Sequence, residues 1–225
     1  MSHIAWIGTG VMGTSMATNL SKQGHSITLF NRTPEKANIA AAACHGTACT
    51  TIAEAVKNAD IIFTIVGYPK DVEEVMLGKG GIFDSAKPGA LIIDMTTSLP
   101  SLAAKLHTLG KERGLRVMDA PVSGGDSGAK KGTLSIMVGG DAMDFDEAKP
   151  LFAAMGTNIV HMGPAGNGQH TKAANQIAVA GATAAMTEAL VYANRVGLDP
   201  EQMLAAIGAG AAGSWQLQNM APRVL

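Results

Sequence analysis

The sequence has few cysteines, no excess of charge of either sign and no long apolar segment. Its two cysteines, Cys44 and Cys49, are too few for a disulfide framework and have no histidine or cysteine partner at metal-ligand spacing. We expect both to be buried or partly buried residues of a protein in a reducing cytoplasm, with His45 on the surface. The sequence therefore predicts neither a disulfide-stabilised protein nor a metal site.

The charge balance and the hydropathy pattern argue against two further classes. The sequence has 17 basic and 18 acidic residues, which give a net charge of -1, and it has no basic stripe. Both features argue against a nucleic acid partner. No apolar run approaches the roughly 18 to 20 residues that a membrane-spanning helix needs. The first residues already have the composition of a core strand, so we expect no signal peptide and no membrane partner. A chain of 225 residues can bury a sizeable core.

What the sequence does have is a glycine-rich turn near its N-terminus, between a strand pattern and a helix pattern. An apolar run over residues 3–7 leads into Gly8-Thr9-Gly10-Val11-Met12-Gly13, and apolar residues then recur at helical spacing to about Gln23. In a G-x-G-x-x-G turn the first glycine allows the tight turn, the second lets a pyrophosphate approach the backbone, and the third lets the helix pack on the strand. The helix N-terminus attracts the negative charge. The turn alone is a weak signal among 27 glycines, but its flanks favour a dinucleotide site.

The residues after the second strand pattern, 26–30, bear on the choice of dinucleotide. NAD-binding units usually place a carboxylate about 20 residues after the glycine turn, where it accepts hydrogen bonds from the ribose. This sequence has Asn31-Arg32-Thr33 there. Arg32 can bind a 2′-phosphate through two hydrogen bonds, and Asn31 and Thr33 add neutral donors. We therefore predict NADP as the cofactor, with NAD as the alternative. The alternative interpretation of Arg32 is purely structural: its side chain only solvates the end of a strand.

Strand and helix patterns continue to alternate to about residue 162, which predicts an α/β fold with a doubly wound Rossmann-type sheet in residues 1–162. Ligands of such sheets bind at the carboxyl ends of the strands. We therefore expect Val66 and Gly67, at the end of the strand predicted over 60–66, to contact the cofactor. The strand predicted over 90–94 is followed by Thr96, whose hydroxyl could cap the next helix or reach the nicotinamide end of the cofactor.

The pattern changes at residue 163, where a glycine-rich hinge precedes an alanine-rich helix pattern that continues to about Val196. We predict a second, all-helical domain over 163–225, too small to bury its own apolar faces, and hence a homo-oligomer. On the long helix Lys172 and Asn175 are three residues apart and share a face. Because clefts between domains are preferred ligand sites, Lys172 is a candidate acid–base residue. The alternative interpretation is that Lys172 and Asn175 only form the solvated side of the helix.

Four motifs stand in order along the whole chain. They are the glycine turn, Asp119-Ala120-Pro121-Val122-Ser123-Gly124-Gly125, the segment from Gly166 to Asn175, and Gly213-Ser214-Trp215. In these motifs the sequence resembles the β-hydroxyacid dehydrogenase family, which includes 3-hydroxyisobutyrate dehydrogenase, tartronate semialdehyde reductase and glyoxylate/succinic semialdehyde reductase.

The resemblance implies an NAD(P)-dependent oxidoreductase that transfers hydride between nicotinamide and a small β-hydroxy acid or semialdehyde. Lys172 would be its general acid/base, and Asn175 would orient Lys172 or the substrate. A substrate carboxylate would lie against Ser123, Gly124 and Gly125. The resemblance also implies that Thr96 lies at the nicotinamide end of the cofactor.

The family continues after the last motif through several further helices, including a lysine that closes over the cofactor, whereas this sequence ends at Leu225. We therefore expect either a fragment or a truncated product, and the alternative function is a catalytically impaired NADP-binding or scaffolding protein. A polyol-phosphate substrate, as in the related 6-phosphogluconate dehydrogenases, is disfavoured because no basic cluster is available for its phosphate.

Overall fold

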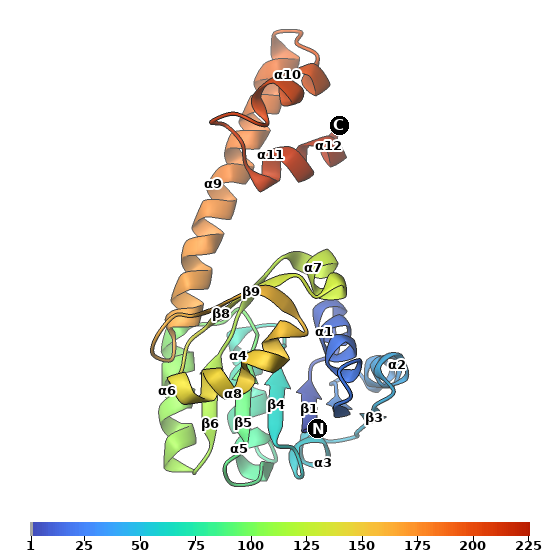
Figure 1. Cartoon of the computed structure of the whole chain (residues 1–225), viewed down its shortest axis with the longest axis vertical. Helices are drawn as coiled ribbons and strands as arrows, with labels where there is room; N and C mark the ends of the chain where they lie inside the picture. The colour runs from blue at the N-terminus through green and yellow to red at the C-terminus, as the bar shows by residue number, and fades with distance from the viewer. Residues whose placement is uncertain (1) are drawn as a thin grey trace. The chain divides into compact units, whose positions relative to one another are not determined.

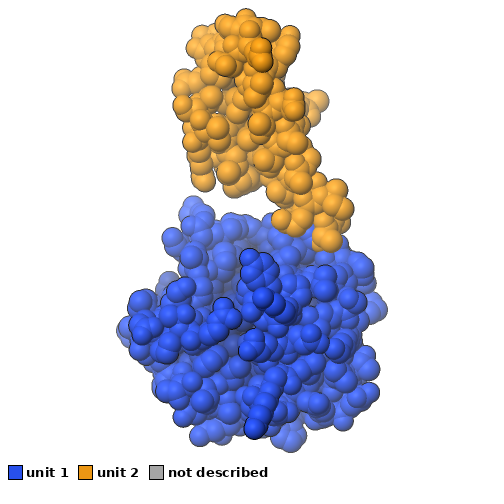
Figure 2. Space-filling view, turned by 180° about the vertical axis from the view of Figure 1, so that it is seen from behind, with its two compact units in different colours: residues 1–172 blue, residues 173–225 orange. Residues whose placement is uncertain are grey.

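The computed structural model describes residues 2–225, which fall into two compact units, residues 1–172 and residues 173–225 (Figure 2). Helix α9 (Asn167–Arg195) begins in the first unit and ends in the second. The division into domains that the sequence predicts at residue 163 stays a prediction. Over the described residues, no helix has the length and apolar character needed to cross a membrane.

The first unit is built on a six-stranded sheet with the order β3-β2-β1-β4-β5-β6, in which every neighbouring pair is parallel (Figure 1). Its strands are β1 (His3–Ile7), β2 (Ser26–Phe30), β3 (Thr47–Ala48), β4 (Ile61–Thr64), β5 (Leu91–Asp94) and β6 (Arg116–Asp119). All residues of β4 and β5 are buried, as expected for central strands covered on both faces. The predicted doubly wound fold is thereby confirmed, and the carboxyl ends of all six strands lie along one edge.

Helices cover both faces of this sheet. They are α1 (Val11–Ser21), α2 (Pro34–Cys44), α3 (Ile52–Val56), α4 (Pro69–Leu77), α5 (Ile82–Ser85) and α6 (Pro100–Glu112). Alternate residues of β1 enter opposite cores: Trp6 packs with Met16 of α1 on one face, and Ile7 packs with Met76 of α4 on the other. Cys44 is buried, Cys49 is partly buried and His45 is exposed, as the sequence predicts.

A second sheet follows β6. It contains β7 (Val122–Ser123), β8 (Leu134–Val138) and β9 (Gly156–His161), with α7 (Gly125–Lys131) and α8 (Ala142–Ala153) in the connections. Strands β7 and β8 are antiparallel, whereas β8 and β9 are parallel. The sequence pattern did not separate these strands from the main alternation. They form their own sheet beyond the end of β6, where Asp119 pairs antiparallel with Gly139 after β8. Gly124, with a φ of 131°, then turns the chain from β7 into α7.

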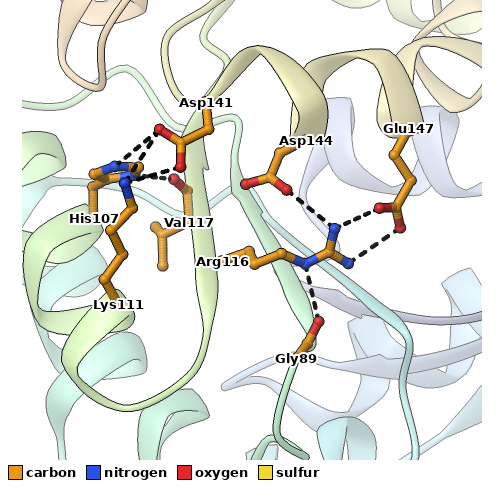
Figure 3. A network of polar contacts seen from close by, with 8 residues as sticks. All are labelled: Gly89, His107, Lys111, Arg116, Val117, Asp141, Asp144 and Glu147. Atoms are coloured by element: carbon orange, nitrogen blue, oxygen red, sulfur yellow. Dashed lines mark hydrogen bonds and ion pairs between the residues drawn. The ribbon is translucent and has the colours of Figure 1, made fainter.

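Two ionic clusters hold α8 against the rest of the first unit (Figure 3). In one, Arg116 at the start of β6 pairs with Asp144 at 3.1 Å and with Glu147. In the other, Lys111 of α6 pairs with Asp141 at 2.9 Å, just before α8 begins. The Arg116 cluster lies at the start of β6, at the opposite end of that strand from Asp119, so it stabilises the fold at a distance from the predicted site.

The second unit contains most of α9 together with α10 (Pro200–Ile207), α11 (Trp215–Asn219) and α12 (Ala221–Val224). Its buried cluster is small and consists of Met186, Leu217 and Ala221. Asp199 caps α10 by accepting from the amide groups of Glu201 and Gln202, and Ser214 caps α11. The helix predicted to about Val196 ends at Arg195, so its extent is close to the expected one.

Candidate active site

The glycine turn joins β1 to α1 at the carboxyl edge of the sheet. Gly8 has a φ of 100°, and a Cβ there would lie 2.1 Å from the carbonyl oxygen of Ile65. A Cβ on Gly13 would lie 2.0 Å from the carbonyl oxygen of Gly8, so α1 packs directly on the turn. A Cβ on Gly10, by contrast, would meet nothing within 4 Å. Gly8 and Gly13 thus allow close packing of the backbone. Gly10 leaves open space at the helix N-terminus, which fits a dinucleotide pyrophosphate.

Thr9 supports the same conclusion. Its hydroxyl oxygen is buried and has no hydrogen-bond partner among residues 2–225. Gly10 is the N-cap of α1 and provides no side-chain cap, so the amide groups of the first helical turn have no side-chain acceptor there. Unpaired donors at the N-terminus of a helix are suited to an anionic ligand. The residues of this turn therefore fit the phosphate-bearing part of a dinucleotide.

Asn31, Arg32 and Thr33 follow β2 at the same edge, but they differ in what they contact. The side chain of Asn31 accepts a hydrogen bond from the amide of Thr9 at 3.0 Å and donates one to the carbonyl oxygen of Thr33 at 3.1 Å. Asn31 thus supports the glycine turn. The Arg32 side chain is 85% exposed, and its only ion pair among the described residues is a long one of 3.5 Å to Asp71. Thr33 is exposed and precedes α2 without capping it.

Val66, Gly67 and Thr96 lie at the ends of β4 and β5. The amide of Val66 donates to the hydroxyl of Thr96 at 3.0 Å, and Gly67 is exposed. Of the two alternatives for the loop hydroxyl, capping of the next helix is wrong, because Leu99 is the N-cap of α6 and makes no side-chain cap. The Thr96 hydroxyl accepts from the backbone after β4 instead, which ties two strand ends together.

The first turn of α9 is fastened to the ends of β5 and β6 by two buried side chains to which the sequence patterns assign no role of their own. The carboxylate of Asp119 accepts from the amides of Gly166 at 2.7 Å and Gln169 at 2.9 Å. The side-chain amide of Gln169 donates to the carbonyl oxygen of Thr96 at 2.7 Å and accepts from the amide of Ser98 at 2.8 Å. A carboxylate at the end of a buried strand was the available signal for Asp119.

Lys172 follows one helical turn after Gln169 and is the last residue of the first unit. Its side chain is buried, with 8% of its surface exposed, and it makes no hydrogen bond or ion pair within the described part of the chain. Burial lowers the pKa of its amino group from the ordinary value. Asn175 belongs to the second unit, where its side-chain amide donates to the side-chain oxygen of Gln176 at 2.9 Å.

Ser123, Gly124 and Gly125 form the turn between β7 and α7. Ser123 is partly buried, and both glycines are exposed with positive φ values of 131° and 62°. The helix after this turn, α7, packs on α1, where the side-chain amide of Asn19 donates to the carbonyl oxygen of Ala129 at 2.8 Å. No hydrogen bond among residues 2–225 joins Ser123 to Lys172.

A separate cavity of about 410 Å³ lies in the first unit beside α6 and the start of α8. Its lining includes His107, Asp141 and His161 and none of the residues that the sequence predicts for the site. In the described residues no group of three or more histidine, cysteine or carboxylate side chains could hold a metal ion.

Comparison with known proteins identifies both parts of the chain. Residues 3–163 match the family described as the NAD binding domain of 6-phosphogluconate dehydrogenase. Residues 166–225 match the family described as NAD-binding of NADP-dependent 3-hydroxyisobutyrate dehydrogenase. The matched segments contain the glycine turn and the lysine-bearing segment of α9, so a nicotinamide dinucleotide is the cofactor class.

Individual relatives agree with these matches. An uncharacterized oxidoreductase of Bacillus subtilis is 52% identical over 99% of this chain and 77% of its own length. The 2-hydroxy-3-oxopropionate reductase of Escherichia coli is 38% identical over 99% of this chain and 75% of its own length. Among solved structures, Mycobacterium tuberculosis 3-hydroxyisobutyrate dehydrogenase with L-serine is 34% identical, with a TM-score of 0.90 over 99% of this chain and 75% of that one.

Proposed function

The chain belongs to the β-hydroxyacid dehydrogenase family of NAD(P)-dependent oxidoreductases, and on that premise we propose that it is an NADPH-preferring reductase of a small semialdehyde or keto acid. The observation that carries the proposal is the buried Lys172, which lies one helical turn beyond a residue bonded to the ends of the parallel strands. The reverse reaction is the oxidation of a small β-hydroxy acid.

The cofactor would be held along the carboxyl edge of the sheet. The residues proposed to contact it are Gly8, Thr9, Gly10, Val11, Met12, Gly13, Asn31, Arg32, Thr33, Val66, Gly67 and Thr96. The open space at Gly10 and the unpartnered Thr9 hydroxyl support a pyrophosphate at the start of α1. Thr96 connects this region to α9 through Gln169. When bound, the nicotinamide supplies or accepts the hydride.

Lys172 would move the proton that accompanies the hydride. In the reducing direction its ammonium group donates a proton to the substrate oxygen on which negative charge develops. In the oxidising direction its neutral amine takes the proton of the hydroxyl group. An ordinary lysine, with a pKa of about 10.4, is rarely neutral near pH 7. The lowered pKa that burial causes is therefore the property that the second role needs. Asn175, three residues further along α9, would orient Lys172 or the substrate.

The substrate carboxylate would lie at the turn between β7 and α7. Ser123 provides a hydroxyl donor, and the exposed backbone of Gly124 and Gly125 leaves room for an anionic group to approach. Both glycines have positive φ values, so a side chain at either position would strain this backbone as well as cover it. A small hydroxy acid or semialdehyde with one carboxylate is the substrate class that this turn favours.

The NADP preference depends mainly on Arg32. Asn31 already uses its side chain to support the turn, whereas the Arg32 guanidinium is exposed and only loosely paired with Asp71. A guanidinium binds a phosphate through two charge-assisted hydrogen bonds, which a ribose hydroxyl cannot match. The 2′-phosphate would compete with Asp71 for Arg32.

We also propose that the protein is a homo-oligomer. The second unit exposes large apolar side chains, among them Ile177 at 75% and Trp215 at 58%, while its buried cluster has three residues. A second copy is the simplest partner for such a surface. Light scattering after size-exclusion chromatography tests this assignment, and a monomeric mass at micromolar concentration would contradict it.

The test of the function is a substrate panel assayed with both cofactors. It contains glyoxylate and the succinic, tartronate and methylmalonate semialdehydes, with L-serine for the oxidising direction. We expect oxidation of NADPH with at least one carbonyl compound, at a higher kcat/KM than with NADH. A protein that binds NADPH but turns over no compound would contradict the reductase assignment, and an equal or better rate with NADH would contradict the cofactor preference.

A further inference from the structure

The start of α9 rests on a carboxylate that is enclosed by protein. Asp119 is 2% exposed and makes no ion pair within residues 2–225, so its charge is compensated by the amides of Gly166 and Gln169. Backbone amides at a helix N-terminus can donate hydrogen bonds to a buried carboxylate and so compensate its charge without a cation. Burial nonetheless raises the pKa of Asp119 above the ordinary value.

Two glycines pack against this carboxylate so closely that neither position has room for a side chain. A Cβ added at Gly168 would lie 2.7 Å from one oxygen of Asp119 and 2.4 Å from the carbonyl oxygen of Met137. A Cβ added at Gly139 would lie 2.6 Å from the other carboxylate oxygen. Because side chains at these positions would displace the carboxylate, the two glycines fix where the first turn of α9 begins.

Gln169 adds a second attachment from the same helical turn. Its side chain is 2% exposed and satisfies two backbone groups of the loop after β5, the carbonyl of Thr96 and the amide of Ser98. Thr96 is itself bonded to the amide of Val66 and, through its own amide, to the carboxylate of Asp94. The first turn of α9 is thereby connected to the ends of β4, β5 and β6.

Lys172 is the next residue on the Gln169 face of the helix. Residues three apart lie one above the other, and helical side chains lean toward the N-terminus, over the preceding turn. The position of the Lys172 amino group is therefore set by where the first turn of α9 lies. Because Lys172 has no hydrogen-bond partner of its own within the described residues, that turn and the packing around it are what hold the amino group in place.

We propose that Gln169 and Asp119 are positioning residues of the active site, which hold the start of α9 so that Lys172 remains buried and faces the reacting atoms. The assignment rests on the proposed role of Lys172 as general acid/base. Neither residue touches the substrate. Both act by fixing the helical turn that carries the lysine.

The test compares Gln169→Met and Asp119→Asn with the unchanged protein, using the full chain and the substrate that the panel identifies. Methionine has nearly the size of glutamine and removes both hydrogen bonds to the loop. We expect kcat to fall about 10- to 100-fold, because a displacement of about 1 Å at a catalytic group can cost that much. KM and the Kd for NADPH should stay within about threefold, since binding contacts are retained.

A second readout separates positioning from general loss of structure. In the reducing direction the rate falls at high pH as Lys172 loses its proton. If the start of α9 shifts and the Lys172 amino group becomes more solvated, its pKa rises toward the ordinary value. The fall in rate at high pH, the alkaline limb of the pH profile, then moves to higher pH. Asp119, which accepts from the amide of Gln169, and Asp94, which accepts from the amide of Thr96, are the buried carboxylates connected to this turn, and both are unchanged in Gln169→Met. Asp144→Asn, which weakens the ionic cluster at Arg116, is the matched control: it should lower the unfolding temperature and leave kcat and the alkaline limb unchanged.

The outcomes are distinct. A Gln169→Met protein with kcat within about threefold of the unchanged protein and an unmoved limb would overturn the positioning role, as would an equal loss of kcat in Asp144→Asn. If Gln169→Met does not fold, Asp119→Asn is judged by the loss of kcat at retained KM and NADPH affinity, because the loss of its own charge also acts on the alkaline limb. Lys172→Ala tests the proposed function separately: if that variant keeps its turnover, the role of the lysine fails together with the positioning role. If only the Gln169 and Asp119 variants are unaffected, the lysine retains its role.

Discussion

Asp94 and Asp119 lie opposite each other in register at the carboxyl ends of β5 and β6, and both are buried. Neither forms an ion pair with another of residues 2–225. Burial raises the pKa of Asp94 to about 6, and the nearby charge of Asp119 acts in the same direction, while hydrogen bonds from Thr64 and Thr96 oppose the shift. The edge of the sheet where the cofactor is proposed to bind therefore carries two carboxylates that are costly to ionise.

Asp94 should make the stability of the protein depend on pH. In the unfolded chain an aspartate titrates near pH 3.9, so between about pH 4 and 6 the folded state binds the extra proton and stability falls as the pH rises. Asp94→Asn keeps an oxygen acceptor for Thr64 and Thr96 and has no charge. Relative to the unchanged protein, the variant should gain about 2 kcal/mol in unfolding free energy between pH 4.5 and 7. Urea unfolding at pH 4.5 and pH 7 measures the unfolding free energies of both proteins. A difference between variant and unchanged protein that is the same at both pH values would contradict the prediction.

The glycines of the first turn should separate folding from cofactor binding. Gly13→Ala places a Cβ 2.0 Å from a carbonyl oxygen of the backbone, so we expect a large loss of stability, of several kcal/mol. Gly10→Ala has space for its Cβ and an ordinary φ of -72°, so its unfolding temperature should be unchanged or slightly higher. Its Kd for NADPH should nevertheless rise at least about tenfold, because the Cβ occupies the approach of the pyrophosphate. Thermal unfolding and cofactor fluorescence measure the two effects; unchanged NADPH affinity in Gly10→Ala would contradict the proposed cofactor position.

Arg32 should determine the preference between the two cofactors. Arg32→Ala removes an exposed side chain with one long ion pair, so the unfolding free energy should change by less than about 0.5 kcal/mol. The Kd for NADPH should rise roughly 10- to 100-fold, the usual effect of losing charged hydrogen bonds, while the Kd for NADH stays nearly constant. Lys22→Ala, at the far end of α1, is the control for a general loss of positive charge and should leave both constants unchanged. Equal weakening of the two cofactors by Arg32→Ala would show that Arg32 does not contact the 2′-phosphate.

Much of the fold could be predicted from the sequence, because its signals are local. The apolar runs of β4 and β5, the glycine turn at Gly8 and the alanine-rich α9 each follow from residues close together in the chain. The second sheet was not recognised, because strands β7 to β9 have the same local pattern as the main strands and differ only in their partners. The pairing of β8 with β9 is a long-range relationship that periodicity does not encode.

The site was predictable to a similar degree. The family motifs point to Lys172 and to the glycine turn, but the roles of neighbouring residues depend on contacts between distant segments. Asn31 is an example, since its side chain supports Thr9 instead of remaining available as a donor to a phosphate. Gln169 is another, because its partners Thr96 and Ser98 lie about 70 residues earlier in the chain. Such pairings appear only when the strand ends and the start of α9 are placed in space.

The proposed transfer of a proton by Lys172 during hydride transfer is tested by the turnover of Lys172→Ala, measured alongside its affinity for NADPH. We expect kcat to fall by a factor on the order of 10² to 10⁴, with a Kd for NADPH within about threefold of the unchanged protein. Thr171→Ala is the matched control, since it removes a neighbouring side chain whose hydroxyl, among residues 2–225, bonds only to the backbone of α9 at Asn167, and it should keep its turnover. Lys172→Ala protein that binds NADPH and retains its turnover would show that Lys172 is not the general acid/base.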